Sequence, residues 1–254
     1  MKKKIKKLIS TFGYEIKLKS KTSQVPIGSD MRPVGSMKYL LEDLKFRGLE
    51  CNSIMDVGAS RALWSRMAKG IFPESKFYLI EPQLEVESYL IDFCKTYKDS
   101  VYFLNGAGSK KEILTLTIWD DLSGSSLIYE EKNELLKSGK QRKIKVIKID
   151  NLIEEEKLDI PEIMKLDIQG FELEALKGAS KTFGITEVYI LEVSLYSFGA
   201  PVINEVISFM LERNYVIYDF PGFLRRPLDG SLYQCDICFV KKASFLRQFH
   251  HWND

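Results

Sequence analysis

The chain has 254 residues, of which 45% are hydrophobic and 28% charged, a balance that excludes wholesale disorder. That length suffices for one large α/β domain or two small ones. The net charge of +2 is unevenly spread, because residues 1–21 carry +7 and the remainder −5. No run approaches the roughly 20 apolar residues of a membrane span, and the four cysteines are too sparse for a secreted disulfide framework. We therefore expect a cytoplasmic protein.

Residues 1–25 form a predicted basic tail that lacks the continuous apolar run of a signal peptide. Two interpretations of this tail stay open. It is either a solvated terminus or an amphipathic segment that contacts anionic lipids at the inner face of the membrane. We place a single domain at residues 26–245 and a C-terminal tail at residues 246–254. That tail contains both histidines of the chain, His250 and His251.

Apolar periodicity in the body predicts strands that alternate with helices. The predicted helices are residues 37–46, 62–70, 83–97, 171–177 and 202–213, and the predicted strands are residues 53–57, 77–80, 101–104, 163–166, 188–191, 215–218 and 236–240. Residues 113–119 and 143–149 read as a hairpin-like insertion that carries a mobile loop. The last strand follows the predicted loop 221–230 without a helix, so we expect it to run antiparallel. The fold class is α/β, a mostly parallel sheet with helices on both faces.

Five predicted strands end on a polar side chain, which predicts one ligand site. These residues are Asp56, Glu81, Asn105, Asp167 and Glu192. In an open α/β sheet, ligands bind beyond the carboxyl ends of the strands. The recurrence of polar groups at those ends therefore indicates a binding site at that edge of the sheet.

The first of these turns, Asp56 to Ser60, says which ligand to expect. It contains only one glycine, Gly58, and so lacks the G-x-G-x-x-G pattern that cradles pyrophosphate. Asp56 would repel a phosphate but suits the cationic methionine end of S-adenosylmethionine. Glu81 stands where a carboxylate would hold a ribose diol. The predicted cofactor residues are Asp56, Gly58, Ala59, Ser60, Glu81, Pro82, Asn105, Gly106 and Ala107.

Three other functions are alternatives to a site for S-adenosylmethionine that serves methyl transfer to a small molecule or glycan. An NAD-dependent or nucleotide-sugar oxidoreductase would share the sheet, but the missing glycine pattern counts against it. A methyltransferase acting on RNA would share the cofactor site, but the body of this chain is acidic and its basic tail lacks interleaved aromatic residues, so we expect no nucleic-acid partner. A non-catalytic scaffold with the same fold stays open.

Several stretches of the chain resemble the FkbM family of methyltransferases over roughly residues 50–240. They are residues 54–59, 79–82, 124–127, 146–150, 164–178 and 189–193, and the run KLDIQGFELEALKG is the most distinctive. The resemblance implies a class I methyltransferase fold with a seven-stranded sheet. It also implies methylation of an oxygen, often on a sugar of a polysaccharide, glycolipid or secondary metabolite. The family usually continues the first turn with asparagine and a second glycine, where this chain has Ser60, Arg61 and Ala62.

The body of the chain contains no histidine, so a carboxylate is the expected general base. Asp167 is the first candidate and Glu192 the second. Two neighbouring carboxylates raise one pKa, or they bind Mg²⁺ through their oxygens. The alternative for Asp167 is that it caps the following helix.

Two further pairs of residues are candidates for binding the acceptor. Ser125 and Ser126 match the family's G-S-S segment and can hydrogen-bond a hydroxylated acceptor. Arg225 and Arg226 can bind a phosphate or carboxylate, although two solvated surface charges are a slightly better interpretation. Cys235 and Cys238 have C-x-x-C spacing, but in a strand their side chains point to opposite faces, so we expect no metal there.

Overall fold

The computed structural model describes residues 26–196 and 201–249. The chain divides into two compact units, residues 1–32 and 33–254. The described part of the first unit is a turn in which Arg32 Nε donates to the carbonyl of Pro26. The lysine-rich segment and the two histidines singled out above lie outside the described residues. No helix in the described part is long and apolar enough to cross a membrane.

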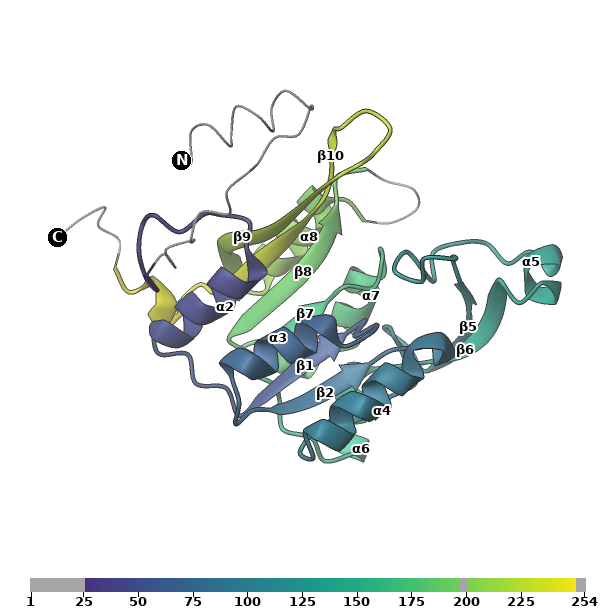
Figure 1. The fold of residues 1–254 in the computed structure, drawn as a ribbon, viewed down its shortest axis with the longest axis horizontal. Helices are drawn as coiled ribbons and strands as arrows, with labels where there is room; N and C mark the ends of the chain where they lie inside the picture. Colours follow the sequence, from purple (N-terminus) through teal and green to yellow (C-terminus); the bar gives the residue numbers. More distant parts are fainter. Residues whose placement is uncertain (1–25, 197–200, 250–254) are drawn as a thin grey trace, which may run out of the picture. The chain divides into compact units, whose positions relative to one another are not determined.

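A seven-stranded sheet forms the centre of the second unit (Figure 1), with the strand order β3-β2-β1-β7-β8-β10-β9. The strands are β1 (Ser53–Val57), β2 (Lys76–Ile80), β3 (Val101–Phe103), β7 (Ile163–Leu166), β8 (Val188–Ser194), β9 (Tyr215–Arg225) and β10 (Leu232–Lys241). Strands β3, β2, β1, β7 and β8 are parallel, and β10 runs antiparallel to both β8 and β9. The predicted fold class and its antiparallel last strand are confirmed.

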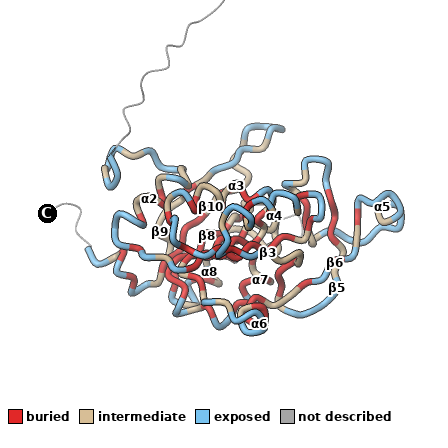
Figure 2. The backbone as a smooth tube through the Cα atoms, turned by 60° about the horizontal axis from the view of Figure 1, so that its bottom comes forward, coloured by how far each residue is buried: buried red, intermediate tan, exposed pale blue. Residues whose placement is uncertain are grey.

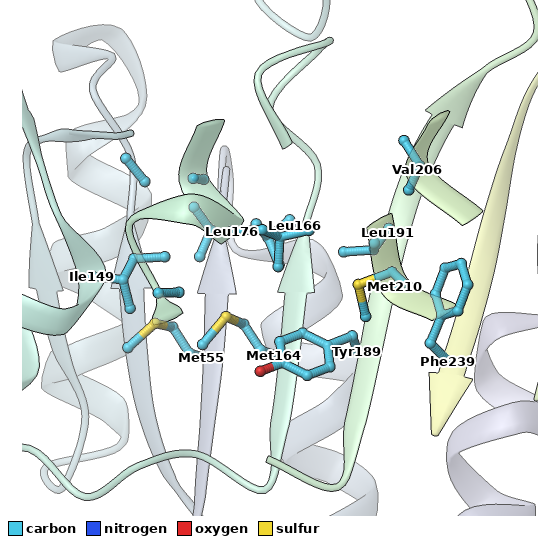
Figure 3. Close-up of a cluster of buried hydrophobic side chains, with 14 of the residues drawn as sticks. Met55, Ile149, Met164, Leu166, Leu176, Tyr189, Leu191, Val206, Met210 and Phe239 are labelled. Carbon is cyan, nitrogen blue, oxygen red and sulfur yellow. The ribbon is translucent and has the colours of Figure 1, made fainter. Parts of the chain in front are cut away.

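Helices cover both faces of this sheet, as Figure 1 shows. The helices α2 (Met37–Phe46), α3 (Leu63–Ile71) and α4 (Glu87–Thr96) pack on one face, and α6 (Ile149–Glu155), α7 (Glu172–Lys177) and α8 (Ile203–Glu212) on the other. Figure 3 shows the core on the face of α6, α7 and α8, which contains Met55 and Met164 of the strands, Leu176 of α7 and Met210 of α8. Cys235 belongs to this core and Cys238 to the opposite one, which confirms that the two thiols lie on opposite faces.

The hairpin-like insertion forms a small second sheet of order β4-β6-β5. Its strands are β4 (Gly106–Ala107), β5 (Glu112–Thr117) and β6 (Gln141–Ile147), and the segment between β5 and β6 contains the short helix α5 (Asn133–Lys137). Figure 2 shows that the central strands are buried, whereas α5 has no buried residue. Because β4 directly follows Asn105, the insertion is attached to the predicted cofactor site.

Several element boundaries differ from the prediction, and tertiary contacts explain the differences. Glu192 lies inside β8 rather than at its end, because antiparallel pairing with β10 extends β8 to Ser194. The predicted loop at residues 221–230 begins only after Arg225, since Pro221 sits in the edge strand β9, where a missing N–H is tolerated. The predicted helix at residues 83–97 divides into η1 (Leu84–Val86) and α4. Helices α5 and α6 were not predicted.

The C-terminal boundary also differs. The turn η3 (Phe245–Arg247) packs Leu246 into the core on the face of α2, α3 and α4, with only 7% of its surface exposed. Packing therefore continues past residue 245, where the predicted tail begins.

Candidate active site

One cavity of about 590 Å³ opens at the carboxyl ends of β1, β2, β7 and β8, where the strand-end rule places a ligand. Its volume falls within the range of cavities that enclose a small organic ligand. All nine predicted cofactor residues line it, and so do Asp167, Glu192, Ser125 and Ser126. Arg225 and Arg226 do not appear in its lining.

The turn after β1 is held in a tight conformation beside the end of β7. Gly58 has a φ of +84°, and a Cβ at this position would lie 1.9 Å from the main-chain oxygen of Asp167. Ser60 and Ala62 also have positive φ, of 46° and 55°. Asparagine and glycine tolerate this region best, so serine and alanine adopt it here at a cost of about 1 kcal/mol each.

Glu81 joins this turn to the segment that follows β2. Its Oε2 accepts the backbone N–H of Ser60 at 2.8 Å, and its Oε1 accepts the N–H of Gln83 at 2.9 Å. Glu81 is 2% exposed, and this burial raises its pKa. The carboxylate at the edge of the cavity is thus fixed by two backbone donors and keeps further lone pairs for a ligand.

A buried lysine on β7, Lys165, links the carboxylates of two strand ends. Its Nζ lies 2.9 Å from Oδ2 of Asp167 and 3.9 Å from Oδ1 of Asp56. Asp56 is fully buried, and its other oxygen accepts the hydroxyl of Ser65. Burial alone would lower the pKa of Lys165, but the two carboxylates outweigh it and raise that pKa. Lys165 is therefore a charged ammonium within the sheet.

Asp167 and Glu192 lie side by side on neighbouring strands and hydrogen-bond to each other. Burial would raise the pKa of Asp167, but Lys165 outweighs it and holds that pKa below its usual value. Burial, followed by the charge of Asp167, raises the pKa of Glu192 well above its usual value. The two pKa shifts run in opposite directions, so Asp167 is the more acidic carboxyl of the pair and Glu192 the one that binds a proton more tightly.

Two glutamines fix the orientation of this pair. Nε2 of Gln169 donates to Asp167 Oδ1 at 3.0 Å and also to Glu192 Oε2. Nε2 of Gln234, on β10, donates to the same Glu192 oxygen at 3.1 Å. Both glutamines line the cavity. Their amide donors point at the carboxyl pair, so their carbonyl oxygens are the atoms left for hydroxyl donors of a ligand.

Glu172 shapes the loop that carries Gln169. Its Oε1 accepts the backbone N–H groups of Ile168 and Gly170 at 3.0 and 3.2 Å. The N-cap of α7 is Phe171, and the side chain of Asp167 bonds to Lys165 and Gln169, so the capping interpretation of Asp167 is wrong. Burial raises the pKa of Glu172 to about 7.

We expect Glu172→Gln to make the protein more stable at pH 8 than the wild type. Because the folded state binds this proton more tightly than the unfolded chain, wild-type stability falls as pH rises from about 4.5 to about 7. Glutamine keeps an acceptor for Ile168 and Gly170 but has no charge to bury. The expected gain is up to about 3 kcal/mol at pH 8 and near zero at pH 4.5. Urea unfolding at both pH values measures it, and an equal change at both would contradict the prediction.

The four residues predicted to bind the methyl acceptor all form hydrogen bonds within the protein. Ser126 Oγ donates to the carbonyl of Gln169 at 2.7 Å, and Ser125 Oγ accepts the N–H of Trp119, which leaves the Ser125 hydroxyl hydrogen for another acceptor. Arg226 forms a bidentate pair with Asp229 and stacks on Tyr196. Arg225 Nη1 donates to the carbonyl of Gly230. Both arginines stabilise the β9–β10 turn.

Sequence reasoning did not single out Lys165, Gln169, Glu172, Gln234 or the buried Gln83 as members of the site. One signal for Lys165 was available, because a lysine inside the apolar strand Ile163–Leu166 must be buried and therefore needs a partner. Gln234 comes from a strand far along the chain, and only its pairing with β8 brings it to Glu192.

The family model for the methyltransferase FkbM domain matches residues 56–217, which is more than half of the chain. The chain belongs to the FkbM methyltransferase family. The match begins at Asp56, the first residue of the cavity, and extends into β9, so it contains the Lys165, Asp167 and Glu192 cluster. No protein of curated function matches the chain by sequence similarity.

Solved structures with a similar fold include other methyltransferases. An FkbM methyltransferase from Methylobacillus flagellatus KT is 21% identical with a TM-score of 0.48, over 78% of this chain and 47% of that one. The chain thus spans about half the length of that relative. A precorrin-6y C5,15-methyltransferase from Geobacter metallireducens is 12% identical with a TM-score of 0.45, over 80% and 86%. A fibrillarin from Aeropyrum pernix, in complex with S-adenosylmethionine, is 10% identical with a TM-score of 0.42, over 76% and 71%.

The carboxyl pair does not fit the Mg²⁺ considered from the sequence. Within residues 26–196 and 201–249, no three histidine, cysteine, aspartate or glutamate side chains are placed to hold a metal ion. The oxygens of Asp167 and Glu192 instead accept an ammonium and two amides. We therefore derive no step through a metal.

Proposed function

We propose that this FkbM domain is an S-adenosylmethionine-dependent O-methyltransferase that acts on a hydroxyl of a sugar, in a surface polysaccharide, a glycolipid or a secondary metabolite. The observation that carries this proposal is that one cavity joins two kinds of group. The first kind is the turn at Asp56–Ser60 together with Glu81, and the second is the Asp167–Glu192 pair.

The residues of the first kind fit the cofactor. Asp56 Oδ1 is buried and has no hydrogen-bond partner among the described residues. It is therefore still able to accept a hydrogen bond from a cationic amine. Glu81 is held by Ser60 and Gln83 with lone pairs to spare for a diol. Bound there, S-adenosylmethionine would supply an electrophilic methyl group on its sulfonium.

The carboxyl pair supports a base and a place for the acceptor. With the cofactor bound, the acceptor oxygen would take the methyl group as the carbon–sulfur bond breaks and the neutral thioether leaves, and the proton of that oxygen would pass to Asp167. Lys165 keeps that carboxylate charged and fixes its orientation, and Gln169 and Gln234 hold Glu192 beside it. Alignment and proton removal are the two tasks that an in-line methyl transfer leaves to the protein.

The part of the cavity around the carboxyl pair favours a neutral, hydroxylated acceptor. It presents carboxyl groups and the amides of Gln169 and Gln234 beside Lys165, whose ammonium is paired within the protein. Arg61, the other cation that lines the cavity, directly follows the turn at Asp56–Ser60. Carboxyl and amide groups of this kind accept hydrogen bonds from several hydroxyls but repel a phosphate or a carboxylate. A sugar hydroxyl meets both conditions.

Calorimetric titration with S-adenosylmethionine and with NAD⁺ tests the cofactor, and transfer of a tritiated methyl group to a panel of neutral glycans and phosphorylated sugars tests the acceptor. We expect binding of S-adenosylmethionine, no binding of NAD⁺, and labelling of neutral glycans. Binding of NAD⁺ alone would favour the oxidoreductase. Cofactor binding without transfer to any acceptor would favour a non-catalytic scaffold.

A further inference from the structure

We propose that Gln83 recognises the nucleoside of the bound cofactor and couples its presence to the loop at residues 119–127. Gln83 follows Glu81 and Pro82 and lines the cavity. Only 5% of its surface is exposed, and its Oε1 has no hydrogen-bond partner among the described residues. This inference rests on the proposed cofactor but assigns a residue and a coupling that the proposed reaction does not require.

The buried Oε1 of Gln83 needs an explanation, because a buried acceptor without a partner is costly. The backbone N–H of Gln83 already donates to Glu81, and its Nε2 donates to the carbonyl of Leu122 at 3.1 Å. The bond from Nε2 to Leu122 holds the amide in this orientation, with its oxygen buried. A ligand that brings a hydroxyl or amine donor to this part of the cavity removes the penalty.

The amide nitrogen of Gln83 connects the cavity to the loop at residues 119–127. Leu122 has a positive φ of 62°, a conformation that leucine rarely adopts without support from its surroundings. The loop around it is tied to the protein at two places that line the cavity, by Gln83 at Leu122 and by Ser126 at the carbonyl of Gln169. A nucleoside that fixes Oε1 of Gln83 therefore also fixes the amide that holds Leu122.

The donor on the nucleoside comes from one of two sources, the exocyclic amine of adenine or a ribose hydroxyl. Glu81, two residues earlier, is the expected partner of the ribose diol, and Asn105 lines the same cavity from the end of β3. The two sources predict different responses to a ligand that lacks the amine. The test uses S-adenosylhomocysteine and its inosine analogue, in which an oxygen replaces that amine.

We expect Gln83→Met to lower the affinity for S-adenosylhomocysteine about 3- to 10-fold in calorimetric titration, the usual effect of losing one hydrogen bond. If the donor is the amine, the wild type prefers the adenosyl ligand over the inosyl ligand by a similar factor, and the variant loses that preference. If the donor is a ribose hydroxyl, the variant loses affinity for both ligands by the same factor. Gln248→Met, the same substitution at an exposed residue outside the cavity lining, is the matched control.

Hydrogen exchange supplies a readout that is independent of turnover. We expect S-adenosylhomocysteine to slow exchange of residues 119–127 in the wild type and in Gln248→Met, but not in Gln83→Met. Gln83→Leu repeats both measurements if the methionine variant folds poorly. Wild-type affinity in both apolar variants would overturn the assignment, and ligand protection of the loop in both would overturn the coupling. If the wild type does not bind S-adenosylhomocysteine at all, it is the proposed function that fails.

Discussion

Asp167→Asn is expected to lower kcat by about 10²- to 10⁴-fold, the usual contribution of a positioned general base, while S-adenosylmethionine binds with nearly unchanged affinity. Asparagine has the shape of aspartate and can still accept a bond from Lys165. It cannot accept the proton of an attacking hydroxyl. Single-turnover methyl transfer and calorimetric titration of the cofactor measure the two quantities separately.

Glu192→Gln is the matched control for this prediction. Burial, followed by the charge of Asp167, raises the pKa of Glu192 well above its usual value, and glutamine resembles a protonated glutamate in shape and charge. The expected loss of kcat is therefore smaller than for Asp167→Asn. A larger loss in Glu192→Gln would show that Glu192 is the base. Full activity of Asp167→Asn would remove Asp167 from the mechanism.

Lys165→Met is expected to lower the free energy of unfolding by about 3–5 kcal/mol at pH 8, the usual cost of removing one partner of a buried ion pair. The Lys165 side chain is 7% exposed, and its ammonium lies between Asp56 and Asp167. Without it, two carboxylates are left in the interior with no opposing charge. Methionine fills a similar volume, so the loss reports chiefly on charge. Guanidinium unfolding at fixed pH measures it.

The pH dependence of the Lys165→Met variant distinguishes an electrostatic effect from a packing effect. In the wild type the folded-state pKa of Asp167 is depressed, so this group contributes stability above its unfolded pKa that is lost as pH falls through the folded pKa. In the variant the buried carboxylates take up protons instead, so the destabilisation should be smaller at pH 5 than at pH 8. An equal loss at both pH values would indicate packing alone.

Two controls accompany the lysine variant. Lys76→Met removes a lysine from an exposed pair with Asp159 and should leave stability unchanged, because solvent screens that pair. The double variant Lys165→Met with Asp167→Asn removes both partners of the buried pair. It should be less destabilised than the sum of the two single variants.

The order of elements in the central sheet could be predicted from local sequence, because each strand and most helices carry their own apolar periodicity. Strands β1 and β7 and helix α2 have the predicted bounds. Their neighbours β8 and β9 were predicted too short, since their final residues are strand only through antiparallel pairing with β10. At β8 this pairing links residues more than thirty positions apart along the chain, as Glu192 and Asp236 are. Local periodicity does not contain that information.

The location of the site follows from sequence alone, and its chemistry does not. A polar residue after each parallel strand must reach the same edge of the sheet, so Asp56, Glu81 and Asp167 were bound to meet there. Which carboxyl is ionised depends on Lys165 and on the hydrogen bonds of Gln169 and Gln234, which only the folded chain brings together. The sequence by itself thus determined the family, the sheet and the edge at which the cavity opens. The tertiary structure decided the charges within the cavity, because a pKa depends on burial and on neighbours from several strands.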